Sequence, residues 1–397
     1  MKHFLIALTV TLNAFAADLS MAAFDKKAKD KEPLSVVFFG GSLTWGANAS
    51  DPNRTSYRGL MMEYLQKKYP GTPFRFHDAA IGGTGSDLGM FRLERDVLSQ
   101  KPDLVFLDFT VNDDMEGTDG EALASYEFLV RSLLKRDIPV VQVIMACGYH
   151  YREDYSSDEM TRRRDHLKLA KHYNLPVADI YPFMGEKLSS GQLTVPGIWP
   201  FEQTHPDDPG YKVFFDVVKV TYEKAVNDKQ KCNLTEETLF QEIYKSLRRI
   251  RLVENQLPEG WIRGKTYRTS MWYDGLSSRW IDDVALMDAN QSNRVSSISM
   301  KFKGTFLGLI GESNHEGLAF MIKIDGKIFP KVNPKTGESS NVWKWDTSRF
   351  GKGNLLRWLR VSNSLTSGEH TLEIIPVISS STKKGQLRIE SICAAGE

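Results

Sequence analysis

Hydrophobic runs and amphipathic stretches alternate over residues 34–227 of the chain. The runs are short and rich in β-branched and aromatic residues, as in buried strands, and occupy residues 34–39, 74–77, 104–109, 140–145 and 177–180. The stretches between them have helical character and cover residues 57–69, 121–135, 158–173 and 209–227. The third stretch is highly charged, so we expect it to be exposed. Strands that alternate with helices predict a parallel sheet covered by helices on both faces.

The pattern changes in the C-terminal part of the chain. Apolar and polar residues there alternate with a period of two, over residues 296–302, 320–324 and 370–374. Turn signals rich in Gly separate these runs. This pattern predicts an all-β domain, either a sandwich or a jelly roll. Residues 236–251, between the two parts, have the pattern of a connecting helix.

The N-terminus has the pattern of an export signal. A short basic start precedes apolar residues 4–16, and the small residues Ala14 and Ala16 favour cleavage before Ala17. The signal predicts a secreted or periplasmic protein, and an uncleaved membrane anchor is the alternative. The next segment is a Lys-rich lead-in without a core pattern. The expected boundaries are a signal at 1–16, a polar lead-in at 17–33, an α/β domain at 34–230, a helical linker at 231–255 and a β domain at 256–397.

Composition narrows the range of functions. The chain has 397 residues and a formal net charge of +1, which does not indicate nucleic acid or an anionic membrane as a partner. The three cysteines Cys147, Cys232 and Cys393 lack the spacing of metal ligands, and we expect three buried structural thiols. The oligomeric state is left open.

Residues suited to catalysis follow three of the predicted strands. Ser42 comes after a Gly-Gly pair at the end of the first strand, Gly83 lies in the loop after the second, and Asn112 follows the third. The carboxyl ends of parallel strands lie at one edge of a sheet, so these residues should converge there. The glycines before Ser42 allow a sharp turn and leave its hydroxyl uncrowded.

These residues match the needs of acyl transfer, which are a nucleophile, a base and donors for the oxyanion. Ser42 can attack, and His205 can accept its proton because an imidazole titrates near neutral pH. The backbone N–H groups of Ser42 and Gly83 and the side-chain amide of Asn112 can form an oxyanion hole. Glu202 can orient the imidazole. Each residue alone has an ordinary structural explanation, so the prediction depends on the set.

Four short blocks resemble those of the SGNH hydrolases, also called GDSL esterases or lipases. In family order the blocks are GGSLT at 40–44, DAAIGG at 78–83, VND at 111–113 and EQTHP at 202–206. The resemblance covers residues 34–227 and implies a flavodoxin-like three-layer α/β/α fold. It also implies the family's functional residues, in the order nucleophile, oxyanion glycine, oxyanion asparagine and base: Ser42, Gly83, Asn112 and His205.

The sequence departs from the family pattern at two positions. Gly41 stands where the GDSL block has Asp, a variant associated with several carbohydrate-active branches. Glu202 stands where the family usually has Asp and is one methylene longer. Either a Ser-His-Glu triad or a Ser-His dyad helped by a backbone carbonyl is consistent with this sequence.

An export signal with an appended β domain is similar to carbohydrate esterases that deacetylate polysaccharides. We therefore expect an exported serine esterase that acts on O-acetyl groups of a polysaccharide or oligosaccharide, without cofactor or metal. Tyr149, His150 and Trp199 lie on candidate active-site loops and could contact a sugar ring. The alternatives are a lipid or short-chain acyl esterase, a polysaccharide O-acetyltransferase, and a glycan-binding protein with an inactive hydrolase domain.

Overall fold

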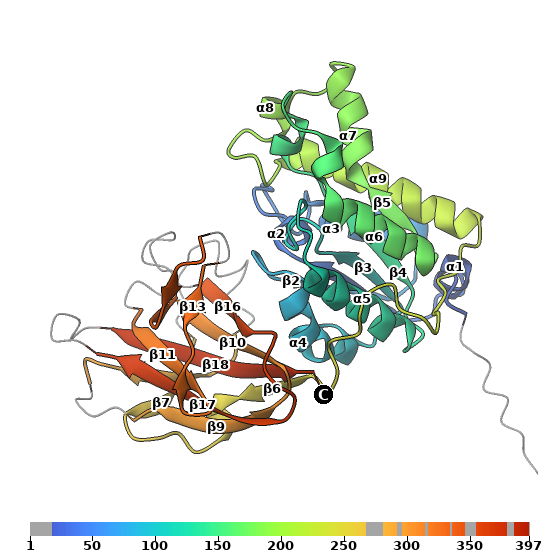
Figure 1. The fold of residues 1–397 in the computed structure, drawn as a ribbon. Helices are drawn as coiled ribbons and strands as arrows, with labels where there is room; N and C mark the ends of the chain where they lie inside the picture. Colours follow the sequence, from blue (N-terminus) through green and yellow to red (C-terminus); the bar gives the residue numbers. More distant parts are fainter. Residues whose placement is uncertain are drawn as a thin grey trace, which may run out of the picture.

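The computed structural model has an N-terminal α/β part and a C-terminal all-β part, which lie side by side (Figure 1). The structure describes residues 18–266, 281–291, 296–313, 317–333, 336–345, 355–378 and 385–396. The predicted export signal, residues 1–16, lies outside the described residues. None of the helices in the described ranges is long and apolar enough to cross a membrane.

The N-terminal part is built on a five-stranded parallel sheet in the order β2-β1-β3-β4-β5. Its strands are β1 Leu34–Gly40, β2 Phe74–Ala80, β3 Leu104–Asp108, β4 Val140–Ile144 and β5 Val177–Asp179. This is the flavodoxin-like strand order. Every residue of β1, β3 and β4 is buried, which is why these strands appear in the sequence as continuous apolar runs. The predicted parallel α/β sheet is confirmed.

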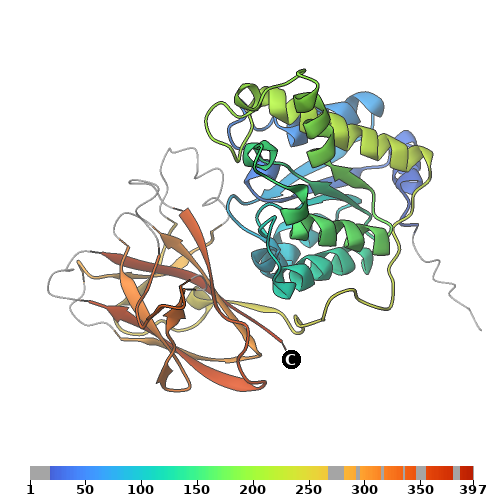
Figure 2. The same ribbon diagram turned by 45° about the horizontal axis from the view of Figure 1, so that its top comes forward.

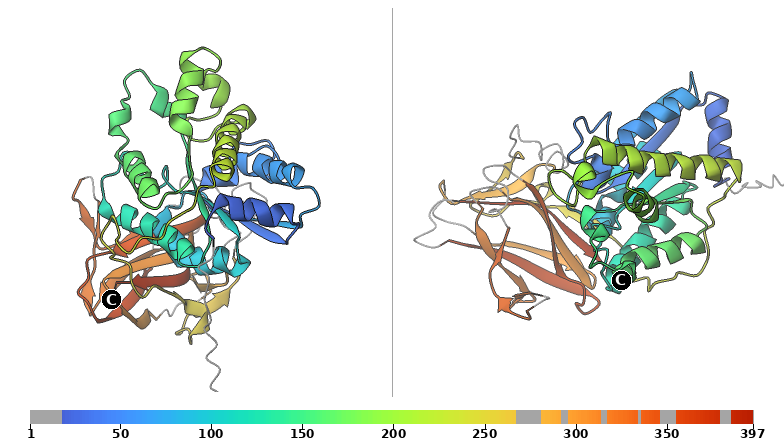
Figure 3. Two further views of the ribbon diagram at one scale, coloured as in Figure 1. Left: turned by 90° about the vertical axis from the view of Figure 1, so that its right-hand side faces the viewer. Right: turned by 90° about the horizontal axis from the view of Figure 1, so that it is seen from above.

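Helices cover the two faces of this sheet (Figure 3). One group contains α1 Met21–Lys29, α3 Tyr57–Lys68 and α9 Asp208–Asn227. The other contains α4 Ser86–Asp96, α5 Gly120–Leu134 and α6 Thr161–His172. Shorter helices lie in the connections: α2 Ser42–Trp45, α7 Ile180–Ser189, α8 Val195–Ile198, and the 3-10 turns Leu98–Gln100, Gly148–Tyr151, Ser157–Glu159 and Leu252–Glu254.

The expectation that helix α6 is exposed was wrong. Its residues Arg162, His166 and Leu169 are buried. The buried Arg162 pairs with Asp119 at 2.7 Å, so its charge is compensated within the fold. Sequence reasoning that counted charges could not see which of them had partners.

The lead-in at 17–33 also contributes to the core. Ser20 caps α1 by accepting a hydrogen bond from the Ala23 N–H, and Met21, Phe24 and Ala28 are buried. These three positions are spaced by three and four residues, so they share one helix face, which packs against α9. The lysines between them occupy the opposite face and hid this short periodicity.

The C-terminal part consists of antiparallel strands in two main sheets, and the predicted all-β domain is confirmed. The first sheet contains β6 Arg248–Arg251, β7 Trp261–Gly264, β8 Val284–Asp288, β10 Phe306–Ser313, β16 Leu355–Ser362 and β18 Gln386–Ala395. The second contains β9 Ile298–Lys303, β11 Ala319–Ile324, β12 Lys327–Ile328, β15 Trp343–Lys344 and β17 Glu369–Val377. A separate pair is formed by β13 Lys331–Val332 and β14 Ser339–Ser340. Residues such as Leu309, Ile322 and Ile389 fill a core of this domain.

The connection between the two parts is not the helix that we expected. Residues 232–247 run as an irregular segment along the α/β part (Figure 2), and residues 248–251 form β6 on the edge of β18. The Glu127 carboxylate of α5 accepts hydrogen bonds from the backbone N–H groups of Leu239 and Phe240, each at 2.8 Å. Arg131 of α5 donates to the carbonyls of residues 235–237. These tertiary bonds satisfy backbone groups that a helix would have paired internally.

The two parts share an apolar interface. Phe91 of α4 stacks on Phe306 with ring centroids 5.5 Å apart, and the Trp358 ring lies 5.7 Å from Phe91. The Trp358 indole N–H donates to the Asp87 carboxylate at 2.7 Å. The core of the α/β part continues through this contact into β10. Because the interface is both apolar and hydrogen-bonded, we expect the β domain to stay docked.

The three cysteines Cys147, Cys232 and Cys393 are buried and free of disulfides, as predicted.

Candidate active site

The candidate nucleophile lies at the carboxyl edge of the parallel sheet. Ser42 is the first residue of α2, directly after β1, and is 7% exposed. The turn requires glycine at Gly40, since a Cβ there would lie 2.3 Å from Thr44 Oγ1 and 2.5 Å from the Asp108 carbonyl oxygen. The close approach of the Thr44 side chain and the β3 backbone to Gly40 therefore decides where the Ser42 hydroxyl emerges.

Ser42, His205 and Glu202 form one hydrogen-bonded chain. Ser42 Oγ lies 2.6 Å from His205 Nε2, and His205 Nδ1 lies 2.5 Å from Glu202 Oε1. A carboxylate only accepts hydrogen bonds, so it keeps a proton on Nδ1 and leaves Nε2 free to accept one from Ser42. The arrangement can therefore perform nucleophilic attack with general-base assistance.

The Glu202 carboxylate is held by several donors. It accepts from the backbone N–H groups of Thr204 at 2.6 Å and His205 at 2.8 Å, as well as from the His205 ring. Partial burial acts to raise the pKa of Glu202, but the hydrogen bonds from the His205 ring and the Thr204 N–H outweigh it and lower the pKa to about 2. Glu202 is therefore ionised throughout the neutral range.

Asn48 supports the positions of Glu202 and His205, and sequence reasoning missed it. Its Nδ2 donates to Glu202 Oε1 and to the His205 carbonyl, both at 3.2 Å. Asn48 has φ +68°, a left-handed conformation that asparagine tolerates better than most residues. It joins the loop after α2 to the loop that carries His205. A single asparagine in a polar loop offers no periodicity or spacing by which to find it.

The two other candidate oxyanion residues lie in neighbouring loops. The Asn112 side chain packs directly on Gly41, where a Cβ would lie 1.9 Å from Asn112 Oδ1. A glycine in place of the family's Asp therefore suits the position that Asn112 adopts here. Gly83 has φ +69°, and no described atom lies within 4 Å of where its Cβ would be. Its backbone is thus accessible. Gly83 lies in the loop after β2, the strand that pairs with β1.

Asp113 ties these loops together. Its Oδ1 accepts from the Ser86 N–H at 2.7 Å, and its backbone carbonyl accepts from Arg162 Nε at 3.0 Å. Burial raises the pKa of Asp113 to about 8. This residue therefore links the loop that carries Asn112 to the start of α4.

A second buried carboxyl group lies behind α2. Asp108, the last residue of β3, accepts a hydrogen bond from Thr44 Oγ1 at 3.0 Å. The Tyr57 hydroxyl lies 3.3 Å from Thr44 Oγ1. Burial raises the pKa of Asp108 to about 7. In the sequence, Asp108 is part of an apolar strand, and nothing there indicates that it meets Thr44.

The three residues expected to contact sugar differ in their surroundings. The loop of Tyr149 and His150 reaches the catalytic loop, because the Gly148 N–H donates to the Gln203 carbonyl at 2.7 Å. His150 is 1% exposed and Trp199 is 4% exposed, with the Trp199 ring packed on Gly148. Burial lowers the pKa of His150 to about 4, so its ring is uncharged at neutral pH. Of the three, only Tyr149 is left with a partly exposed side chain.

Comparison with known proteins finds a family match for the α/β part. Residues 38–213 match the model of the GDSL-like Lipase/Acylhydrolase family. The α/β part of this chain belongs to that family. It is therefore a carboxylic ester hydrolase of the SGNH type, and the resemblance of the four sequence blocks is confirmed.

This SGNH hydrolase has relatives among carbohydrate esterases. An acetylxylan esterase of Geobacillus stearothermophilus is 27% identical over 198 residues, which make up 45% of this chain and 89% of that protein. The crystal structure of a two-domain esterase (CEX) active on acetylated mannans has a TM-score of 0.75 at 22% identity, covering 96% of this chain and 97% of that chain. Its complex with mannopentaose gives a TM-score of 0.74 and 96% coverage of both chains. The fold is therefore shared across both domains.

Proposed function

We propose that this protein is an exported serine esterase that removes O-acetyl groups from a polysaccharide or its oligosaccharides. The observation that carries the proposal is the chain from Ser42 Oγ through the His205 ring to Glu202, with contacts of 2.6 and 2.5 Å. A hydroxyl, an imidazole and a carboxylate in this order are the parts of a serine hydrolase.

In the first half of the reaction, Ser42 Oγ attacks the acetyl carbonyl carbon while its proton passes to His205 Nε2. The negative charge on the carbonyl oxygen is met by the N–H groups of Ser42 and Gly83 and the amide of Asn112. The tetrahedral intermediate then breaks its bond to the sugar oxygen, which takes the proton from His205. The sugar leaves with a free hydroxyl, and the acetyl group remains on Ser42.

In the second half, water replaces the sugar. His205 removes a proton from the water, the resulting hydroxide attacks the acetyl-Ser42 ester, and collapse returns the proton to Ser42 Oγ and releases acetate. Glu202, ionised at neutral pH, stabilises the imidazolium that forms in each half. No group other than these side chains and backbone amides is required.

Two comparisons support a carbohydrate substrate. A relative of the α/β part is an acetylxylan esterase, and a two-domain esterase of the same overall fold is active on acetylated mannans. The N-terminal sequence pattern of an export signal agrees with a substrate outside the cell, since polysaccharides do not enter it.

The test is acetate release from acetylated mannan, acetylated xylan, and short- and long-chain nitrophenyl esters. We expect release from at least one polysaccharide and from the short-chain ester, and Ser42→Ala should lose nearly all of both while keeping its far-UV circular dichroism. Turnover by purified Ser42→Ala at the wild-type rate would contradict the mechanism. A preference for long acyl chains without release from polysaccharide would favour a lipid esterase.

A further inference from the structure

A buried arginine lies directly behind the nucleophile turn. Arg92 of α4 is 1% exposed, and its guanidinium donates to two strand-end carbonyls. One terminal nitrogen, Nη2, lies 3.0 Å from the Gly40 carbonyl oxygen, and the other, Nη1, lies 2.5 Å from that of Ala79. Nothing in the sequence pattern sets Arg92 apart from the other charged residues of this helix.

These carbonyls belong to β1 and β2, the two strands that lead into the turns of Ser42 and Gly83. Gly40 is the last residue of β1, two positions before Ser42, and its carbonyl also accepts from the Ile81 N–H at 3.0 Å. Ala79 lies in β2, four positions before Gly83. One rigid guanidinium therefore spans both strands at the point where each turns into the site.

Packing and charge hold the guanidinium in this place. It lies over the Phe39 ring at 4.5 Å and near the Phe109 ring at 5.7 Å, so its plane is fixed by a residue of β1 and by the residue that follows β3. Burial lowers the pKa of Arg92 to about 10, which still leaves it charged at neutral pH. A buried cation is costly to hold, so this position needs compensation by its surroundings.

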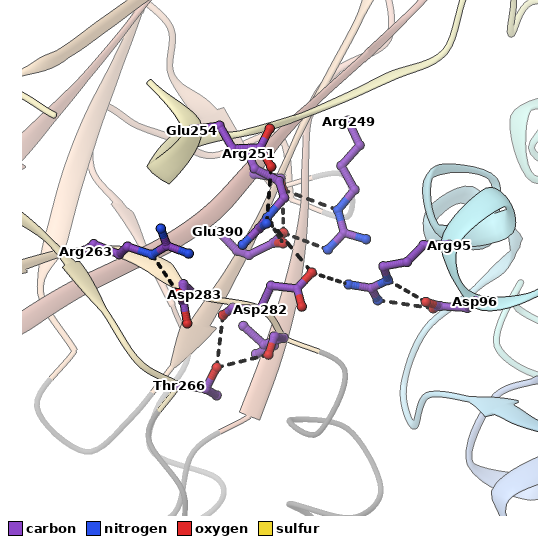
Figure 4. Close-up of polar contacts among 12 residues, drawn as sticks. Arg95, Asp96, Arg249, Arg251, Glu254, Arg263, Thr266, Asp282, Asp283 and Glu390 are labelled. Atoms are coloured by element: carbon purple, nitrogen blue, oxygen red, sulfur yellow. Dashed lines mark hydrogen bonds and ion pairs between the residues drawn. The ribbon is translucent and has the colours of Figure 1, made fainter. Parts of the chain in front are cut away.

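The compensating carboxylate lies at the border with the β domain. Asp96 is 3.4 Å from Arg92 and is shared with Arg95, whose Nε lies 2.5 Å from Asp96 Oδ1. Arg95 in turn pairs with Asp282 of the β domain at 2.9 Å, and Asp282 lies 4.0 Å from Arg251 (Figure 4). The carboxylate that faces Arg92 is thus itself fixed by an ion pair that reaches across the domain interface.

We propose that Arg92 is a positioning residue for acyl transfer, whose guanidinium holds the ends of β1 and β2 so that the Ser42 and Gly83 N–H groups address one oxyanion. The proposal rests on the proposed function, because it requires Ser42 to be the nucleophile. It assigns Arg92 no contact with substrate. It differs from a purely structural role in one respect: loss of Arg92 must weaken stabilisation of the transition state more than binding of the substrate.

The test compares Arg92→Lys and Arg92→Met with the wild type on a short-chain nitrophenyl ester. A lysine keeps the charge but has one nitrogen where the guanidinium uses two fixed ones, whereas methionine keeps only the aliphatic volume. We expect kcat to fall about tenfold or more in Arg92→Met and less in Arg92→Lys, with KM changed by no more than about twofold. Arg388→Met is the matched control, since Arg388 is a buried arginine of the β domain that pairs with Glu312. It should lower the melting temperature and leave kcat unchanged.

A second measurement separates positioning from loss of fold. A small boronic acid forms a tetrahedral anionic adduct with a serine nucleophile, so its affinity should fall in the Arg92 variants by the same factor as kcat/KM. Unchanged kcat in a folded Arg92→Met would overturn the proposal, as would equal losses of activity in Arg388→Met. If Arg92→Met does not fold, Arg92→Lys decides, and failure of both to fold assigns Arg92 to stability alone. Inactivity of the wild type would instead overturn the proposed function.

Discussion

At the scale of single residues, the site depends on contacts that are close enough to exclude other side chains. Gly40 and Gly41 are required by steric approach, the first to Thr44 and Asp108 and the second to Asn112. Asn48 adopts a left-handed backbone and bonds to both Glu202 and the His205 carbonyl. The sequence pointed to Ser42, His205 and Glu202 through their order and spacing, and the structure brings these three together.

The contact between Glu202 and His205 can be tested by Glu202→Gln. The amide keeps the shape but removes the charge, and its NH₂ group would face the N–H donors that now point at the carboxylate. If Glu202 orients His205, kcat should fall on the order of 10²–10⁴-fold, measured with a nitrophenyl ester. Gln203→Ala, the next exposed side chain along the loop, is the control. A nearly unchanged kcat in Glu202→Gln would favour a Ser-His dyad.

At the scale of elements, the site is assembled by what lies behind the strand ends. Helix α2 has only four residues, and its Thr44 is bonded to Asp108 at the end of β3. Helix α4 supplies Arg92 to the carbonyls of β1 and β2. Both contacts join elements that are distant in sequence. Strand boundaries were predictable to within a few residues, because the runs are apolar and β-branched. The polar residues behind them were not, because a lone Asp or Arg carries no period.

The buried Asp108 predicts a specific pH dependence of stability. Its pKa is raised from about 3.9 in an unfolded chain to about 7, so the folded state binds an extra proton between these values. The stabilisation from this proton is present below about pH 4 and is lost as the pH rises through 7. Asp108→Asn does not titrate and keeps an oxygen that can accept from Thr44.

The difference in free energy of unfolding between Asp108→Asn and wild type should therefore shift in favour of the variant by up to about 1.4 kcal/mol per pH unit between pH 4 and 7. Above pH 8 the difference should be constant. Asp113 titrates in both proteins and cancels in the comparison. Urea unfolding of both proteins at several pH values measures this difference in free energy of unfolding. A difference independent of pH would contradict the raised pKa of Asp108.

At the scale of the whole molecule, the β domain is part of the same packed structure as the hydrolase domain. The core of the α/β part extends into the first sheet of the β domain through Phe91, Phe306 and Trp358. Polar contacts surround this apolar centre, with Arg360 bonded to Glu121 at 2.6 Å and Arg95 to Asp282 at 2.9 Å. These ion pairs are partly exposed and contribute little free energy, so the aromatic contacts should dominate docking.

Trp358→Ala tests this interface. It removes a half-buried ring and leaves the Asp87 carboxylate without its indole donor, so we expect a loss of about 2–3 kcal/mol in the free energy of unfolding. Trp358→Phe retains a ring against both Phe91 and Phe306 and should lose less. Urea denaturation followed by circular dichroism measures both. A Trp358→Ala protein as stable as the wild type would indicate that the two domains pack independently of this contact.

The sequence by itself determined the order of strands and helices in the first part, the change to an all-β pattern in the second, and the family to which the hydrolase domain belongs. Each of these depends on local periodicity or on a short run of residues, which the chain displays directly. It misled where local pattern was weak: the lead-in became a helix with one buried face, and the expected linker helix became an irregular segment whose backbone is bonded to Glu127 and Arg131.

Only the tertiary structure decided which polar residues support the site. Thr44 meets Asp108 across 64 positions of sequence, and Arg92 meets Gly40 across 52. Whether a buried charge has partners, and which strand ends it holds, depends on the register and packing of several elements at once. These are long-range properties that no short stretch of sequence contains.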